Sequence, residues 1–106
     1  MNNEDMEITE EITQEGVKLT IKGQINSGNA GKLQDRLQNA FDEGHVNMIL
    51  NMMWVKFLSS AGIRIIIKTY QEVVRAGGKL GIEMPSQNVR NVLGMTALDE
   101  MLIRKQ

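Results

Sequence analysis

The sequence contains no cysteine and only one histidine among its 106 residues. The absence of cysteine excludes disulfide bonds, thiolate nucleophiles and thiolate metal sites, and it fits a protein of the cytoplasm. Apolar residues nowhere run unbroken for the roughly eighteen positions that a membrane-spanning helix needs, and the acidic N-terminal stretch lacks the pattern of a signal peptide. We therefore expect a cytoplasmic protein that is neither embedded in a membrane nor exported.

Net charge is also nearly absent, because twelve basic and thirteen acidic residues give −1. The chain therefore lacks the excess of positive charge that proteins use to bind the phosphates of nucleic acids. The charges are unevenly placed: the first fifteen residues hold six acids and no base, which leaves a net charge of +5 for the rest. We expect an acidic edge strand, kept soluble by its charges, on a mildly basic body.

The length and the 42% hydrophobic content predict one domain, residues 1–106, with a single core. Alternating apolar residues over 6–13 and 17–21 predict a hairpin that Gly23 closes. Apolar residues at steps of three and four predict a helix over 30–41. The continuous apolar run 46–53 predicts a strand that is buried on both faces.

The second half of the chain continues this alternation. A helix is predicted to begin near Ser60 and to end at 77–78, followed by a short strand over 80–84. A third helix is predicted to follow, with Ser86 as its cap, and 98–103 reads either as a last helical turn or as an edge strand. This order is typical of an α/β domain with a mixed sheet and a parallel core.

The sequence lacks most of the reactive side chains that enzymes use in catalysis. His45 stands in a turn, where we expect it to face solvent without a carboxylate that could orient its ring. The segment 26–33 resembles a phosphate-binding loop only superficially, because Asn26 and Leu33 stand where that loop needs glycine and a hydroxyl. The eight methionines are expected to fill core gaps, and a pliable partner surface around Met95 and Met101 is the alternative. We expect no catalysis, no metal site and no cofactor.

One segment, FLSSAGIRIII over 57–67, does suggest a function. Ser59 and Ser60 fall between a buried strand and an amphipathic helix, at the edge of the sheet where α/β proteins usually carry function. One serine suffices to cap the helix, so capping does not explain both. The small residues Ala61 and Gly62 would leave the nearby backbone open to an approaching macromolecule.

A phosphate on either serine would add a charge of roughly −1.5 to −2 beside the free amides at the positive end of the helix dipole. The modified form would therefore be tolerated locally. Against an apolar or acidic partner surface, the same charge would have to lose its water without gaining a cation. We predict a switch that acts by repulsion. Nearby Trp54 could pack in the core or contact a partner, and both alternatives stay open.

The serine segment resembles the Asp-Ser-Ser-Gly or Asp-Ser-Ala-Gly segment of STAS domains, named after sulfate transporters and anti-sigma factor antagonists. The stretches 23–33, 49–58, 77–80 and 89–96 are similar to other parts of these domains, so the resemblance covers nearly the whole chain. It implies an α/β fold with a mixed sheet of four or five strands and three or four helices packed mainly on one side.

For a stand-alone bacterial member, the resemblance implies an anti-sigma factor antagonist. Such a protein, when unphosphorylated, binds a serine/threonine kinase that is also the anti-sigma factor, and the sigma factor goes free. Phosphorylation by that kinase breaks the complex, and a PP2C-type serine phosphatase, which depends on metal, resets it. The antagonist is a substrate and no enzyme.

Aligned without gaps, Ser59 takes the place of the family's aspartate and Ser60 that of its first serine. The resemblance therefore implies Ser60 as the phosphoacceptor, with Ser59 as second choice. Asn26 and Asn51 stand where aspartates are common, so up to three negative charges are missing around the site, and Arg64 replaces a common glycine. The expected partner-binding residues are Asn26, Trp54, Phe57, Leu58, Ala61, Gly62 and Arg64.

Two alternatives remain open at this point. The chain could be a STAS module that holds a nucleotide or a small anion at the same helix start, with Asn26, Ser59 and Ser60 as donors. It could also be a scaffold that works without phosphorylation. In each case we expect a monomer whose edge strand is available for weak pairing.

Overall fold

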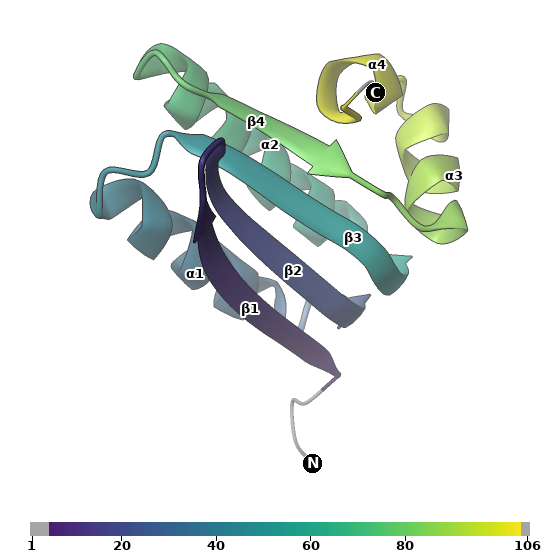
Figure 1. Ribbon diagram of the computed structural model, residues 1–106. Helices are drawn as coiled ribbons and strands as arrows, with labels where there is room; N and C mark the ends of the chain where they lie inside the picture. Colours follow the sequence, from purple (N-terminus) through teal and green to yellow (C-terminus); the bar gives the residue numbers. More distant parts are fainter. Residues whose placement is uncertain (1–4, 105–106) are drawn as a thin grey trace.

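Four strands form one mixed sheet in the order β1-β2-β3-β4 in the computed structural model, which describes residues 5–104 (Figure 1). β1 (Met6–Thr13) pairs antiparallel with β2 (Gly16–Ile25). β3 (Asn47–Leu58) runs parallel to β2 and to β4 (Lys79–Glu83). The α/β class and the mixed sheet with a parallel core are thus confirmed.

Two long helices cover one face of this sheet. α1 (Ala30–Asp42) connects β2 to β3, and α2 (Ser60–Arg75) connects β3 to β4. Figure 1 shows both on the same side of the sheet, as parallel strands joined by crossovers require. The strands and these helices enclose one core, whose largest fully buried side chains are Met6, Leu19, Ile21, Ile25, Leu33, Leu37, Met48, Leu50, Met52, Ile66, Ile82 and Leu93.

The opposite side of the sheet, here called the open face, carries polar side chains such as Glu7, Lys18, Lys22 and Glu83. The prediction that the central strand is buried on both faces is confirmed only in part, because Ile49, in register with Lys18 on the open face, is 5% exposed, whereas Met53 is 37% exposed. On β3, Leu50 is fully buried under the helices, whereas Trp54 is 56% exposed on the open face. β3 continues to Leu58, further than expected, and the later part of its open face is uncovered.

The hairpin is also longer than predicted. Gly23 does not close β2, which continues to Ile25. Gly23 has a φ of +101° and lies opposite Met6. A Cβ at this position would collide with the carbonyl oxygen of Asp5. The glycine therefore permits the close approach of β1 at this position, next to a register shift in the β2–β3 pairing, and does not form a turn.

β1 is the acidic edge strand that the charge pattern predicted. Two cations of α1 hold it from the helix side: Lys32 Nζ donates to the carbonyl of Met6 at 2.9 Å, and Arg36 donates to the carbonyl of Ile8 at 3.1 Å. Arg36 also lies 3.5 Å from a carboxylate oxygen of Glu10. The cations of α1 are thus engaged inside the molecule.

The last part of the chain packs at the end of the sheet where β3 and β4 finish (Figure 1). α3 (Gln87–Met95) begins at Ser86, whose hydroxyl accepts from the amide of Val89 at 3.2 Å, as predicted. α4 (Asp99–Leu102) follows, and Ile103 then forms a bridge with β4. Both alternatives for the tail are therefore realised in succession. No helix within residues 5–104 is long and apolar enough to cross a membrane.

An ion-pair network joins this tail to the open face. Arg104 lies 3.2 Å from Glu83 and 3.2 Å from Glu15, and Lys18 lies 2.8 Å from the other carboxylate oxygen of Glu83. The hydrogen bond and the negative charge of Glu83 raise the pKa of Lys18 above its ordinary value. The network links β2, β4 and the C-terminal segment across the sheet.

Candidate functional site

Ser59 is the N-cap of α2, at the junction where β3 ends. Its side-chain oxygen accepts a hydrogen bond from the amide of Gly62 at 3.3 Å, and its carbonyl accepts from the amide of Ile63 at 3.0 Å. Its own amide donates to the carbonyl of Ile25 at 2.9 Å. Ser59 is half-buried and serves the structure as a cap.

Ser60 is the first residue of α2, and it is exposed. The first amides of a helix have no partner within it, and they form the positive end of the helix dipole. No acidic residue occupies the first turn of α2. The hydroxyl of Ser60 is therefore open to solvent at a position where an added negative charge is electrostatically favoured.

Two of the expected partner-binding residues lie in the interior, which corrects that expectation. Leu58 is only 3% exposed, and Gly62 is buried. A Cβ on Gly62 would come within 2.5 Å of Ile25 Cγ2 and 2.9 Å of Leu58 Cδ1. The glycine lets α2 start directly on the core, so its small size serves close packing and leaves no backbone open to a partner.

Asn26 lies in the loop that follows β2. It is next to the start of α2, because the preceding residue, Ile25, accepts a hydrogen bond from the amide of Ser59. Its side-chain oxygen accepts from the amides of Gly28 at 2.9 Å and Asn29 at 3.0 Å. The side-chain oxygen of Asn29 in turn accepts from the amide of Asn26 at 2.9 Å. Asn26 therefore shapes the β2–α1 loop, half-buried beside the serines.

The remaining expected residues divide between two surfaces. Arg64 is exposed and Ala61 half-buried on α2, near Ser60. Trp54 pairs in register with Lys22 on the open face, so its core alternative is wrong. Phe57, 49% exposed, is in register with Gln24 near the end of β3. The structure thus brings Ser60, Ala61 and Arg64 together on α2. Trp54 lies apart from them, on the open face of the sheet.

His45 differs from expectation. Its Nε2 lies 3.8 Å from a carboxylate oxygen of Glu43, a neighbour that the sequence interpretation overlooked. Glu10 of β1 completes a group whose possible ligand atoms lie within 4.8 Å of one another. Glu10 and Glu43 are exposed, and Glu10 already faces the guanidinium of Arg36. Exposed carboxylates in such a group do not by themselves make a metal site.

Two surface hollows bear on the small-ligand alternative. One lies between β4 and the C-terminal segment, with Leu80, Met101 and Arg104 in its wall. The other surrounds Trp54 and Lys22 on the open face. Neither includes Asn26, Ser59 or Ser60, so neither supports a nucleotide site at the start of α2.

Residues 5–105 match the family model of the STAS domain. The chain belongs to the STAS domain family. This match covers nearly the whole chain and confirms the resemblance that the serine segment and its neighbours suggested. Within residues 5–104 the single α/β domain has four strands and four helices, which is the STAS fold.

One relative of this STAS domain in sequence is provisionally assigned as an anti-sigma factor antagonist. This chain is 28% identical over 72 residues to that relative, BtrV of Bordetella bronchiseptica. That match covers 68% of this chain and 62% of BtrV, so the chain spans less than two thirds of this relative.

Solved structures share the fold at lower identity. An anti-sigma factor antagonist from Mycobacterium paratuberculosis superposes with a TM-score of 0.82 at 20% identity, covering 92% of this chain and 82% of that one. Unphosphorylated SpoIIAA, an anti-sigma factor antagonist, gives 0.80 at 20% identity, covering 94% and 89%. SpoIIAA of Bacillus in its phosphorylated form gives 0.73 at 19% identity, covering 94% and 92%. The STAS domain described here therefore has the fold of anti-sigma factor antagonists.

Proposed function

We propose that this STAS domain is an anti-sigma factor antagonist in a partner-switching pathway. Unphosphorylated, it binds an anti-sigma factor that is also a serine kinase; phosphorylation of Ser60 releases it, and a PP2C-type phosphatase restores it. The domain is the substrate in this cycle and catalyses no step. The observation that carries the proposal is the exposed hydroxyl of Ser60 at the first position of α2.

Ser60 is a better acceptor than Ser59. The side-chain oxygen of Ser59 already accepts from the amide of Gly62, and the residue is half-buried. A kinase would have to break the helix cap in order to reach it, at a cost of about 0.5–2 kcal/mol. Ser60 has its hydroxyl on the surface, and its modification leaves this cap intact.

The physics of a switch follows from the same position. A phosphate on Ser60 would lie at the positive end of the α2 dipole, so the fold would tolerate it. In a docked complex the same dianion would lose its water against the surface of the partner. The free, phosphorylated form is therefore favoured over the phosphorylated complex.

The relatives support this role. BtrV and SpoIIAA are named as anti-sigma factor antagonists, and SpoIIAA has been solved in a phosphorylated form with the fold of this chain. One local difference would distinguish this protein's kinase. Asn26, Asn51 and Ser59 carry no charge where the family commonly has aspartate, so the kinase has to recognise an uncharged surround.

The direct test is phosphorylation by the cognate anti-sigma factor kinase and ATP, followed by intact-mass spectrometry. The wild type should gain about 80 Da, the mass of one phosphoryl group. Ser60→Ala should gain nothing, whereas Ser59→Ala, checked by circular dichroism to be folded, should still gain it. Phosphorylation of Ser60→Ala to the same extent as the wild type would refute Ser60 as the acceptor.

A further inference from the structure

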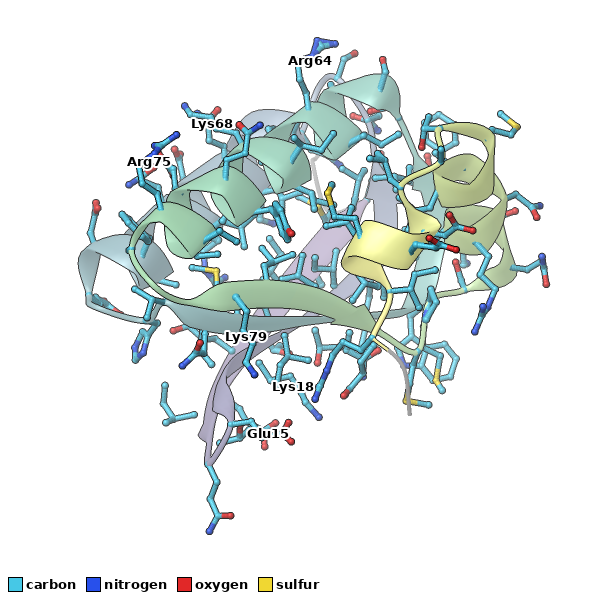
Figure 2. All side chains as sticks on the ribbon, turned by 90° about the horizontal axis from the view of Figure 1, so that it is seen from above. Glu15, Lys18, Arg64, Lys68, Arg75 and Lys79 are labelled. Atoms are coloured by element: carbon cyan, nitrogen blue, oxygen red, sulfur yellow. The ribbon has the colours of Figure 1, made fainter. Side chains whose placement is uncertain are left out.

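All exposed residues of α2 lie on one stripe, here called the α2 outer face. The stripe contains three cations and no acid, and its residues are Ser60, Arg64, Lys68, Gln71, Val74 and Arg75. Figure 2 shows Arg64, Lys68 and Arg75 pointing away from the sheet along the outer side of the helix. Sequence reasoning considered Arg64 alone, although the spacing of four and eleven residues already places Lys68 and Arg75 beside it.

These three cations have no ionic partner within residues 5–104, where each ion pair involves other cations, namely Lys18, Arg36, His45 and Arg104. The contrast with α1 is informative. Lys32 and Arg36 of α1 donate hydrogen bonds to backbone carbonyls of the edge strand β1. The cations of α2 hold nothing within the described part of the molecule.

Helix stability explains only part of the arrangement, because Arg75 lies in the last turn, where a cation is favoured, and Glu72 follows Lys68 by four residues. Arg64 and Lys68 are like charges four residues apart, a spacing that destabilises a helix. Arg64 also lies in the second turn, near the positive end of the helix dipole, where a cation is disfavoured. Arg64, which works against the helix and has no ionic partner within residues 5–104, therefore points to a use outside the fold.

One acid lies beside the stripe: Glu72 of α2, half-buried, is four residues from Lys68 and three from Arg75, so the three cations and this acid give α2 a net charge of +2. The acids of the N-terminal stretch lie elsewhere. Glu10 and Glu11 belong to β1, at the far edge of the sheet, and Glu15 lies in the β1–β2 turn. In Figure 2, Glu15 lies on the side of the sheet opposite to α2. The protein therefore presents a helix with an excess of positive charge on one side, and Glu72 offsets only part of that charge.

We propose that the α2 outer face docks onto an acidic surface of the anti-sigma factor, in a contact that runs the length of the helix and covers Ser60. The inference rests on the proposed function and adds the chemistry of the partner surface. Charge complementarity is the argument for this occupant. Val74, 47% exposed, supplies an apolar contact between the cations. Arg75 lies about 22 Å along the helix from Ser60, so the contact reaches well beyond the acceptor.

This surface gives the switch a specific electrostatic form. Ser60 and Arg64 are four residues apart on the same stripe, so a phosphate on Ser60 cancels part of the positive charge that attracts the partner. It also brings a dianion against acids. Phosphorylation then weakens binding twice over, by neutralising the docking face and by repelling the acidic surface.

The first experiment needs no identified partner. The 15N-labelled protein is titrated with a deca-glutamate peptide at low salt, with deca-glutamine as the uncharged control, and amide shifts are mapped. We expect glutamate-specific shifts concentrated on α2, lost in the variant Lys68→Glu/Arg75→Glu and kept in the matched control Arg90→Glu, which reverses an exposed cation of α3. Shifts centred on Lys18, Lys22 and Lys56 of the open face, or equal shifts with deca-glutamine, would overturn the proposal.

The second experiment uses the cognate anti-sigma factor. Arg75→Glu should weaken its affinity by about tenfold or more, and Arg90→Glu by less than about threefold. Because Arg75 is far from Ser60, separate results refute the phosphorylation switch at Ser60 and the docking of the α2 outer face. Absence of phosphate on Ser60 refutes the switch, whereas a phosphorylated Ser60 together with unchanged affinity for Arg75→Glu refutes only the docking face.

Two other occupants are tested in parallel. Sedimentation with vesicles of phosphatidylserine and phosphatidylcholine detects membrane binding, and sedimentation velocity detects self-association through the acidic β1 of a second copy. We expect neither. Vesicle binding or self-association that Lys68→Glu/Arg75→Glu abolishes would overturn the assignment to an acidic protein surface.

Discussion

The amide of Ser59 donates to the carbonyl of Ile25, with 2.9 Å between nitrogen and oxygen. This bond ties the start of α2 to the end of β2, and Gly62 packs onto Ile25 one turn further on. The exposed Ser60 is therefore held by the core of the domain and not by a loose loop. A site on a rigid element presents its hydroxyl in one geometry, which suits a kinase that must recognise it.

The close packing of Gly62 gives the first prediction. Gly62→Ala places a methyl group 2.5 Å from Ile25 Cγ2 and 2.9 Å from Leu58 Cδ1, so these side chains or the start of α2 must shift. We expect a loss of about 1–3 kcal/mol in the free energy of unfolding, measured by urea denaturation. The matched control is Gly94→Ala in α3, where the methyl meets nothing within 4 Å and the helix should be as stable or more stable. Equal effects of the two substitutions would contradict this packing.

Substitution of the two serines by alanine should affect the free energy of unfolding differently. Ser59→Ala removes the acceptor for the amide of Gly62 and should cost about 0.5–2 kcal/mol of unfolding free energy. Ser60→Ala removes an exposed hydroxyl and should stay within about 0.5 kcal/mol of the wild type. Thermal denaturation of the two variants side by side checks this. A larger loss for Ser60→Ala than for Ser59→Ala would reverse the roles given to them.

The pair Lys18–Glu83 predicts a pH dependence. The folded-state pKa of Lys18 is raised, so its contribution to stability is fully present below the ordinary lysine pKa of about 10.4 and is lost as the pH rises through the folded value. We expect the wild type to be more stable than Lys18→Met at pH 8 to 9, and the difference to shrink above about pH 10.4. Urea denaturation across this range measures it. A difference that grows with pH would contradict the assignment.

Trp54 is the one tryptophan of the chain and reports on the open face. Because its side chain is 56% exposed, its fluorescence should be readily quenched by acrylamide, and Trp54→Ala should change the unfolding free energy by less than about 0.5–1 kcal/mol. Its expected contact with the partner stays a prediction. Protection from acrylamide upon addition of the anti-sigma factor would support it, and unchanged quenching in the saturated complex would reject it.

Much of the fold could be predicted from periodicity. Strict alternation over 17–21 placed β2, and the spacing from Ile63 to Val73 placed α2, because in both cases one side of the element faces the core. Ser86 could be predicted as a cap because an N-cap depends only on residues that are close to it in the sequence. These features depend on neighbours in sequence, and a single chain therefore reveals them.

The features that were missed depend on distant neighbours. Met53 and Trp54 look like a continuation of a buried strand, and only the absence of helices on the second side of the sheet exposes them. Gly62 looks like part of an open surface, and only its contact with Ile25 of β2 shows that it is buried. Glu43, by contrast, was close enough to His45 in sequence to have been considered, and it was overlooked.

The central claim is that a phosphate on Ser60 abolishes docking while the fold persists. The most direct measurement is the affinity of the anti-sigma factor for two preparations of this domain, unphosphorylated and phosphorylated on Ser60, by isothermal titration calorimetry, with circular dichroism of both. We predict identical spectra and an affinity at least about thirtyfold lower for the phosphorylated form, as burial of an unmatched charge implies. Equal affinities of two folded forms would contradict the account.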